Sequence, residues 1–348
     1  MSRRVSMRDV AKSAGVSSST VSYVINQSKD QSISRETIQR VMDTVEQLGY
    51  VPNHAARTLG FAKSSRMNKS HMIGVVIPQT EPGKEFMFSN PFYGDFLSAV
   101  EYTARTRGYH LLISGTDVDQ SYMDIAKTRS LDGIIILGIY PASDIQVYRD
   151  STIPVVLVDC YQNDYYFHQV GTNDRYGSFL ATKHLLDCGH RNIAFVSGSV
   201  AEQSVGHARL QGYKDALRDG GIGPEGHHLF IGDVSYQYGI QAAKSIVAAE
   251  KGITAAHATA DIMALGLLKG FSSCGFSVPE DFSVVGFDDI YMSELCNPGL
   301  STIHQNITQK GRQAAELIIG TAENPDLPKQ DIVIPLSLVE RGSVRSIL

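Results

Sequence analysis

Residues 6–26 read SMRDVAKSAGVSSSTVSYVIN, and this stretch decides the fold of the N-terminal part of the chain. Ser6 precedes Asp9 by three residues, which is the spacing of a helix-start signal, and Gly15 predicts where that helix ends. The apolar positions between these signals share one face of the helix: Val10, Ala11 and Ala14. The first helix is therefore expected to be short and capped at both ends.

A second and a third helix follow. The second is expected to begin after Ser17, and the third is expected between Ser34 and Gly49. Apolar residues recur at helical spacing in both, namely Val21, Val24 and Ile25 in the second and Ile38, Val41, Met42, Val45 and Leu48 in the third. Three short amphipathic helices in residues 1–51 predict an all-α head with one small core.

The joint between the first two helices is only Gly15-Val16-Ser17, which is the geometry of a helix-turn-helix. In that motif the second helix enters the major groove of DNA. Three side chains near its start are expected to face base edges: Ser18, Ser19 and Tyr23. Others are better placed for phosphate oxygens: Ser6, Ser17, Thr20, Ser22 and Asn26. A three-helix module that binds another protein remains the alternative.

Charge separates this head from the rest of the chain. The net charge of the 348 residues is -5, yet up to Arg66 the chain carries ten basic and five acidic residues. The first segment is therefore at +5 and the remainder at -10. A small cationic module joined to a large anionic body favours polyanion binding by the module and a regulatory role for the body.

Length and composition exclude several classes of protein. A chain of 348 residues, 43% hydrophobic and 19% charged, is expected to form at least two globular units. No window has the roughly 18 apolar residues of a membrane span, and the N-terminus MSRRVSMRDV lacks a secretory signal, so we expect a cytoplasmic protein. Neither disulfides nor structural zinc are expected from four scattered cysteines: Cys160, Cys188, Cys274 and Cys296.

Two stretches resemble the DNA-binding head and hinge of the lactose-repressor (LacI/GalR) family of bacterial transcription regulators. They are MRDVAKSAGVSSSTVSYVIN at residues 7–26 and VMDTVEQLGYVPNHAARTL at residues 41–59. The resemblance implies further DNA contacts from the hinge motif: Tyr50, Asn53, Ala56, Arg57 and Leu59. The sequence departs from the family at Tyr23, where an arginine is common, so the operator of better-known members should not be transferred to this chain.

Residues 52–70 are expected to form a hinge helix and a polar linker. Asn53 is a good N-cap and Gly60 a good stop, which leaves a helix of under two turns that is too short to be stable alone. The resemblance implies that two such helices, one from each protomer, pack in the minor groove with Leu59 wedged into a base step. The alternative is that Leu59 packs on the body.

From residue 71 onward, short apolar runs alternate with amphipathic stretches, which predicts parallel sheets covered by helices on both faces. This α/β body, residues 71–348, resembles the periplasmic-binding-protein-like effector domain of the same family, with two doubly wound lobes. The resemblance implies three crossings between lobes, which we expect near Tyr161, Tyr291 and Asn324. The N-lobe would then hold about 71–161 and 292–323, and the C-lobe about 162–291 and 324–348.

Residues just after strands are candidates for a ligand-binding cleft, because the carboxyl ends of parallel strands face a shared space between two lobes. Six fall there: Phe92, Tyr93, Asp159, Asp261, Phe287 and Asp288. The resemblance adds Arg209, an arginine that commonly anchors the effector. Taken singly, each has a structural alternative as a core residue, a cap or an ion-pair partner. Together they favour a neutral, hydroxyl-rich effector, a sugar, with phosphorylated sugars and nucleobases as alternatives.

These features predict a sequence-specific DNA-binding regulator, a repressor that binds a pseudopalindromic operator as a homodimer and is controlled by a small molecule in the cleft. An enzyme is disfavoured because no nucleotide-binding, nucleophile or zinc-protease motif occurs. A sugar-transport protein shares the two-lobe body but needs an export signal. We expect no cofactor, no metal, no membrane partner, and a place in the bacterial cytoplasm, on the nucleoid when DNA is bound.

Overall fold

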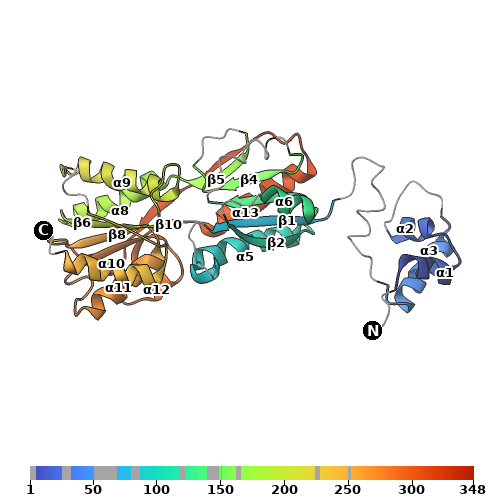
Figure 1. The fold of residues 1–348 in the computed structure, drawn as a ribbon, viewed down its shortest axis with the longest axis horizontal. Coiled ribbons are helices and arrows are strands. Elements are labelled where there is room, and N and C mark those ends of the chain that lie inside the picture. The colour runs from blue at the N-terminus through green and yellow to red at the C-terminus, as the bar shows by residue number, and fades with distance from the viewer. Residues whose placement is uncertain are drawn as a thin grey trace. The chain divides into compact units, whose positions relative to one another are not determined.

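The computed structural model describes residues 5–25, 33–50, 69–79, 87–117, 122–138, 149, 151–161, 166–223, 228–249 and 252–348. The chain divides into two compact units, Met1–Ser70 and His71–Leu348 (Figure 1). No helix among these residues is long and apolar enough to cross a membrane.

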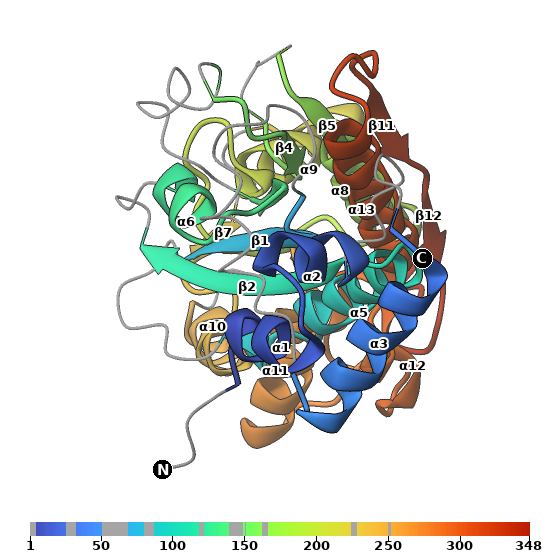
Figure 2. The same ribbon diagram turned by 90° about the vertical axis from the view of Figure 1, so that its right-hand side faces the viewer.

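Within residues 5–25 and 33–50, the first unit has three helices, α1 (Met7–Ala14), α2 (Ser18–Ile25) and α3 (Arg35–Gln47), seen in Figure 2. The predicted start and end of α1 are confirmed. The Ser6 hydroxyl oxygen accepts a bond from the Asp9 amide, the Asp9 carboxylate accepts one from the Ser6 amide at 2.8 Å, and Gly15 ends the helix at φ 67°. These caps satisfy backbone groups that the short helix leaves without partners.

The head core joins all three helices through side chains that are almost fully buried: Val10, Ala14, Val21, Val24 and Val41. The apolar repeat of α3 enters this core only in part, because Ile38 is 40% exposed and Met42 is 47% exposed. The helices α1 and α2 cover only one side of α3, so the stripe that includes Val41 and Thr44 is buried and the neighbouring apolar positions are not.

The N-lobe of the second unit is a six-stranded parallel sheet in the order β11-β5-β4-β3-β1-β2. Its strands are β1 (Met72–Gln79), β2 (His110–Asp117), β3 (Gly133–Leu137), β4 (Val155–Val158), β5 (His168–Thr172) and β11 (Asp331–Ile334). Helices α5 (Pro91–Thr106) and α13 (Ile307–Glu323) cover one face, and α6 (Tyr122–Thr128) covers the other. A short helical turn, η1 (Met87–Ser89), leads into α5.

The alternation of side chains along β1 explains this two-sided covering. Ile73, Val75 and Ile77 pack with α5 and α13, whereas Val76 packs with Tyr122 of α6. Because successive side chains of a strand point to opposite faces, a continuous apolar run is buried on both sides.

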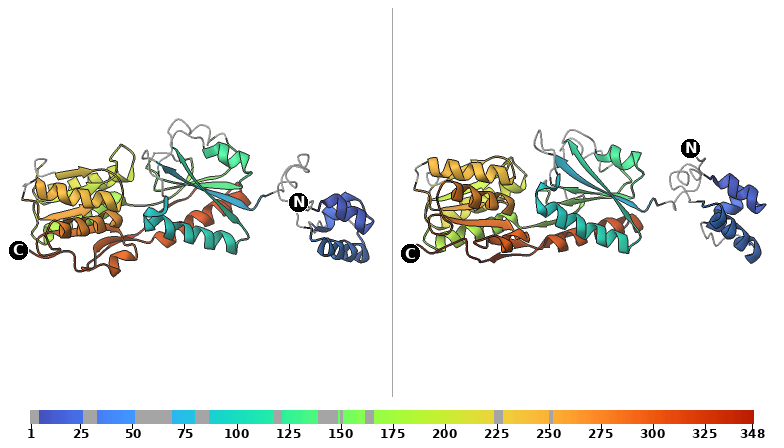
Figure 3. Two further views of the ribbon diagram at one scale, coloured as in Figure 1. Left: turned by 60° about the horizontal axis from the view of Figure 1, so that its bottom comes forward. Right: turned by 90° about the horizontal axis from the view of Figure 1, so that it is seen from below.

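The C-lobe has a second six-stranded sheet in the order β12-β10-β9-β8-β6-β7. Its strands are β6 (Ile193–Ser197), β7 (His228–Ile231), β8 (Ala255–Ala258), β9 (Ser283–Asp288), β10 (Ser301–Gln305) and β12 (Leu336–Val339), of which β12 alone runs antiparallel. Helices α8 (Asp174–Asp187) and α9 (Val205–Asp219) cover one face, and α10 (Tyr236–Ala248) and α11 (Asp261–Ser273) cover the other (Figure 1). A short helix, α12 (Met292–Leu295), follows β9. The expectation of two doubly wound lobes is confirmed, and Figure 3 shows both.

The chain passes between the lobes after β5, after β10, and between β11 and β12. Each crossing comes one strand later than the positions expected at Tyr161, Tyr291 and Asn324. The strands that precede the crossings read HQVGT, STIHQ and DIVI, and the first two mix polar residues among few apolar ones. Such short strands are held mainly by their neighbours in the sheet, so the apolar pattern does not reveal them. As a result β5 belongs to the N-lobe, β10 to the C-lobe and β11 again to the N-lobe.

Candidate functional site

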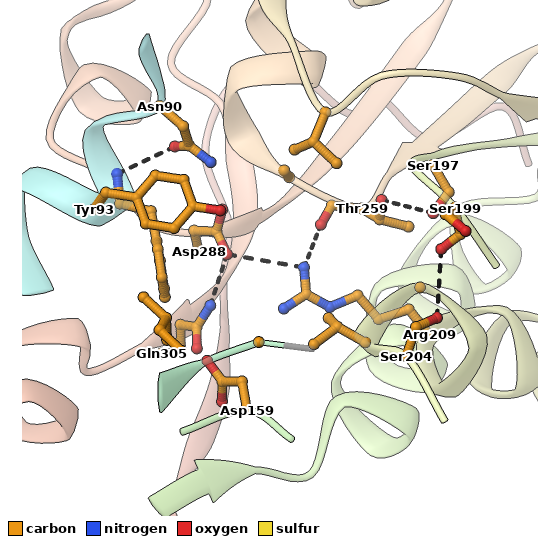
Figure 4. Close-up of a pocket in the computed structure, with 18 residues that line it drawn as sticks. Asn90, Tyr93, Asp159, Ser197, Ser199, Ser204, Arg209, Thr259, Asp288 and Gln305 are labelled. Atoms are coloured by element: carbon orange, nitrogen blue, oxygen red, sulfur yellow. Dashed lines mark hydrogen bonds and ion pairs between the residues drawn. The ribbon is translucent and has the colours of Figure 1, made fainter. Parts of the chain in front are cut away.

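A cavity of about 200 Å³ lies where the carboxyl ends of the strands of both lobes meet (Figure 4). The N-lobe lines it with Asn90, Phe92, Tyr93, Leu137, Gly138 and Asp159. The C-lobe contributes Ser197, Gly198, Ser199, Ser204, Val205, Gly206, Arg209, Val234, Thr259, Ala260, Asp288 and Gln305. The cavity therefore stands at the position where two open parallel sheets commonly bind small molecules.

The aromatic part of the wall is set by the start of α5. The Asn90 side chain caps this helix by accepting a bond from the Phe92 amide at 3.1 Å, and Pro91 occupies the first helical position. Phe92 and Tyr93 then lie with their ring centres 5.6 Å apart and their planes at 85°. The capped start of α5 therefore holds both aromatic rings beside the cavity.

The guanidinium of Arg209 is held in place on every side. Its Nε atom donates to Asp174 Oδ1 at 2.7 Å, its Nη2 atom forms an ion pair with the same oxygen at 2.6 Å, and its Nη1 atom donates to the Thr259 carbonyl. The ring of Phe287 lies under it, with 3.6 Å between the guanidinium carbon and the ring centre. The Tyr161 hydroxyl also donates to Asp174. Arg209 is thus a fixed, buried charge at the base of the cavity.

A second group of polar side chains completes the base. Lys310 Nζ, from α13, donates to Asp159 Oδ1 at 2.7 Å and Oδ2 at 2.8 Å, and to Gln305 Oε1 at 2.6 Å. Gln305 Nε2 donates in turn to Asp288 Oδ1 at 2.6 Å, which lies 3.9 Å from Arg209 Nη1. Asp159 and Asp288 sit at the ends of β4 and β9 with φ of 53° and 121°, so the backbone turns sharply where each carboxylate faces the cavity.

Burial affects both cavity carboxylates. Desolvation raises the pKa of Asp159, and the charge of Lys310 opposes that shift. Desolvation also raises the pKa of Asp288 to about 6, against the opposing charge of Arg209. Asp288 is therefore a weaker acid than an exposed aspartate.

Two residues expected in the cleft do not line the cavity. Asp261 is fully buried, and it accepts bonds from Ser293 Oγ and Thr302 Oγ1, both at 2.6 Å, and from the Ile290 amide at 3.1 Å. It ties the loop after β9 to α11, and desolvation raises its pKa to about 8. Phe287 supports Arg209 from beneath and does not reach the cavity.

Sequence reasoning missed two residues beside the cavity wall, Asp174 and Lys310, and several polar residues that line it: Ser197, Ser199, Ser204, Thr259 and Gln305. Asp174 begins α8 directly after a crossing, and Gln305 ends a strand that the apolar pattern did not reveal. Gln305 follows the rule that polar groups at strand ends face a cleft, and the correct crossing would have found it. Asp174 does not line the cavity, and it acts there through its pair with Arg209. Lys310 gives no such signal, because a lysine in an amphipathic helix is usually exposed.

In the head, Ser17 caps α2. Its hydroxyl accepts a bond from the Thr20 amide at 3.1 Å and is bonded to the hydroxyls of Ser19 and Thr20 at 2.7 and 2.8 Å. Ser18 and Ser19 are exposed on the first turn, and Tyr23 is half-buried. Tyr50 is only 9% exposed and packs in the head core. Several expected DNA contacts lie outside the described residues: Asn26, Asn53, Ala56, Arg57 and Leu59.

A cationic helix-turn-helix and a two-lobed body with a polar cavity between its sheets define a DNA-binding regulator that takes a small-molecule effector. Comparison with family models supports this class. Residues 6–53 match the model of bacterial regulatory proteins of the lacI family, and residues 182–344 match the periplasmic binding protein-like domain.

Whole-chain comparisons lead to the family. The ribose operon repressor of Escherichia coli is 31% identical over 345 residues, covering 97% of this chain and 99% of that protein. The transcriptional repressor PurR of Mannheimia succiniciproducens is 30% identical over 347 residues, covering 98% and 99%. The chain belongs to the lacI family of bacterial regulatory proteins.

Solved structures agree with this assignment. The lac repressor dimer bound to operator and an anti-inducer aligns with a TM-score of 0.78 at 26% identity, covering 99% of this chain and 100% of that chain. A lacI-family regulator from Enterococcus faecium with bound ribose aligns with a TM-score of 0.72 at 27% identity, covering 80% of this chain and all of that one.

Proposed function

We propose that this chain is a dimeric transcriptional repressor whose affinity for a near-palindromic operator is set by a sugar bound in the cavity between its lobes. The observation that carries the proposal is the combination of two rings and two carboxylates in one cavity of a chain that also has a helix-turn-helix head. Carboxylates accept bonds from sugar hydroxyls, and rings lie against the C–H faces of a sugar.

The volume of the cavity and the ligands of related proteins support a small effector. A volume of about 200 Å³ is suited to a single small molecule rather than a polymer. The related Enterococcus faecium structure contains ribose, and the Escherichia coli relative is named for a ribose operon. Phe92, Tyr93, Asp159, Arg209 and Asp288 are the residues proposed to meet the effector, with Gln305 added from the structure.

For the head, we propose that α2 lies in the major groove. The exposed Ser18 and Ser19 and the neighbouring Tyr23 would then face base edges, while Ser6, Ser17, Thr20, Ser22 and Asn26 contact phosphates. Two heads of a homodimer would read half-sites about 34 Å apart, one turn of DNA. Five hinge contacts complete the proposal, with Leu59 as the minor-groove wedge: Tyr50, Asn53, Ala56, Arg57 and Leu59.

Effector control follows from the position of the cavity between lobes. A ligand that bonds both Asp159 and Asp288 touches the N-lobe and the C-lobe, so it favours one angle between them. If that angle sets operator affinity, operator must change effector affinity by the same factor.

The test is a gel-shift titration of the purified full-length protein with DNA from upstream of its own gene, in the presence of random competitor. Specific retention of that fragment, altered by one sugar from a thermal-shift panel, is the expected result. Equal retention of random DNA with every sugar would refute the regulator, and specific retention that no sugar changes would refute only the effector class.

A further inference from the structure

The ammonium of Lys310 is buried behind the cavity wall. Its side chain is 0% exposed, and its three proton positions point at Asp159 Oδ1, Asp159 Oδ2 and Gln305 Oε1 at 2.6 to 2.8 Å. An ammonium has three donors and no acceptor, so Lys310 has nothing left to offer a ligand. Lys310 can therefore affect a ligand only indirectly, through Asp159 and Gln305, the two residues to which it donates.

Lys310 determines how Gln305 is oriented. An ammonium requires an acceptor and the Asp288 carboxylate requires a donor, so both neighbours demand that Gln305 turn its oxygen to Lys310 and its nitrogen to Asp288. Without Lys310, only the bond from Gln305 Nε2 to Asp288 would remain to orient this side chain. Lys310, which belongs to the N-lobe, therefore helps to fix the orientation of the Gln305 side chain at the end of β10 in the C-lobe.

Lys310 also determines the charge of the cavity base. The charged groups there are Asp159, Asp174 and Asp288 against Lys310 and Arg209, which leaves one negative charge. Asp174 is satisfied by Arg209, and Asp159 is satisfied by Lys310. Without Lys310, Asp159 would be an almost buried carboxylate facing the cavity with no cation of its own.

We propose that Lys310 is a specificity-determining positioning residue, which disfavours cationic ligands beside Asp159 by satisfying that carboxylate from behind the wall and by holding the oxygen of Gln305. The inference rests on the proposed effector site. It predicts that removal of the lysine charge turns the same cavity into one that prefers an organic cation, because the nearest place for a counter-charge is then the cavity itself.

The first experiment does not depend on the identity of the effector. Full-length K310A is heated with propylammonium chloride, with sodium chloride at equal ionic strength, and with 1-propanol. Propylammonium is expected to raise the melting temperature of K310A above both controls, and to have no such effect on wild type or on D159N/K310A. A response of K310A to sodium chloride equal to that with propylammonium, or an equal ammonium response of D159N/K310A, would overturn the proposal.

The second experiment measures selectivity by calorimetry with matched pairs, D-glucose against D-glucosamine and D-galactose against D-galactosamine. Wild type and the control K183M, a lysine in the exposed pair with Asp187, are expected to favour the neutral member of the pair they bind. K310M is expected to bind that neutral sugar about tenfold or more weakly and to reverse the preference, since a bond to a charged group changes affinity by roughly 10- to 100-fold. An unchanged preference in K310M would overturn the proposal.

The two experiments separate the possible failures. If wild type binds none of these sugars, the sugar part of the proposed function loses support, while the propylammonium result still decides the role of Lys310. If K310A and K310M do not fold, D159N/K310M decides, because it removes both charges of the buried pair. That variant is expected to fold and to lose the discrimination between neutral and cationic ligands, and its retention of the wild-type preference would refute the inference.

Discussion

Replacing Asp174 by asparagine tests the reasoning about the buried charges most directly. Asp174 is 1% exposed, accepts hydrogen bonds from Arg209 Nε at 2.7 Å and from the Tyr161 hydroxyl, and forms an ion pair with Arg209 Nη2 at 2.6 Å. D174N keeps the shape but leaves the Arg209 guanidinium without its main counter-charge in a site that water hardly reaches. Breaking a buried ion pair in this way costs about 3–5 kcal/mol of the free energy of unfolding.

The assay is urea unfolding of the full-length protein followed by circular dichroism, with the midpoint and slope compared among variants. D174N/R209M removes both charges and is expected to be about 1–2 kcal/mol more stable than D174N, because neighbouring residues are not additive. D187N is the matched control, because its pair with Lys183 is exposed and is expected to contribute less than about 1 kcal/mol. A loss below about 1 kcal/mol in D174N, or a double variant less stable than D174N, would refute the assignment of a buried charge pair.

Three further predictions concern the head, the C-lobe packing and pH. S6A is expected to destabilise the head by about 0.5–2 kcal/mol, measured by its thermal unfolding, because it removes the hydroxyl of the capping box on α1; an unchanged melting curve would show that the cap adds nothing. G212A is expected to separate α8 from α9 and lower the midpoint of urea unfolding, since a Cβ there would stand 2.0 Å from the Arg175 carbonyl oxygen; a wild-type midpoint would contradict that packing. For Asp261, the folded pKa of about 8 lies above the value of about 3.9 expected when unfolded. The folded state therefore holds more protons between these values, so this group lowers stability as pH rises from 4 to 8, and D261N should flatten that slope in urea titrations at several pH values.

The head was predictable because its determinants are local. The capping box of α1, the glycine at its end and the serine before α2 each act within a few residues, so the printed sequence contains the whole interaction. The exception is α3, where Ile38 and Met42 match the helical repeat but remain exposed. Spacing identifies which residues share a face, and only the size of the neighbouring helices decides how much of that face is covered.

Fewer of the residues in the cleft than in the head could be predicted from the sequence. Residues after long apolar strands, such as Tyr93, Asp159 and Asp288, reach the cavity because strand ends converge there. Asp261 follows the same rule but does not line the cavity, because three donors from the segment after β9, from α12 and from β10 satisfy it. Lys310 shows the opposite limit, since its burial depends on partners 5 and 151 residues away in the sequence. No local pattern contains such a contact.

The pairing of Asp159 with Lys310 has an evolutionary consequence. A single substitution at either position leaves the other charge buried without a partner. Proteins that evolved to bind a new ligand are therefore expected to have replaced both residues together, or to have lost regulation for a time. Related sequences should then vary at the two positions together, acid with base or neutral with neutral. Lineages in which one position drifts while the other stays constant would speak against this constraint.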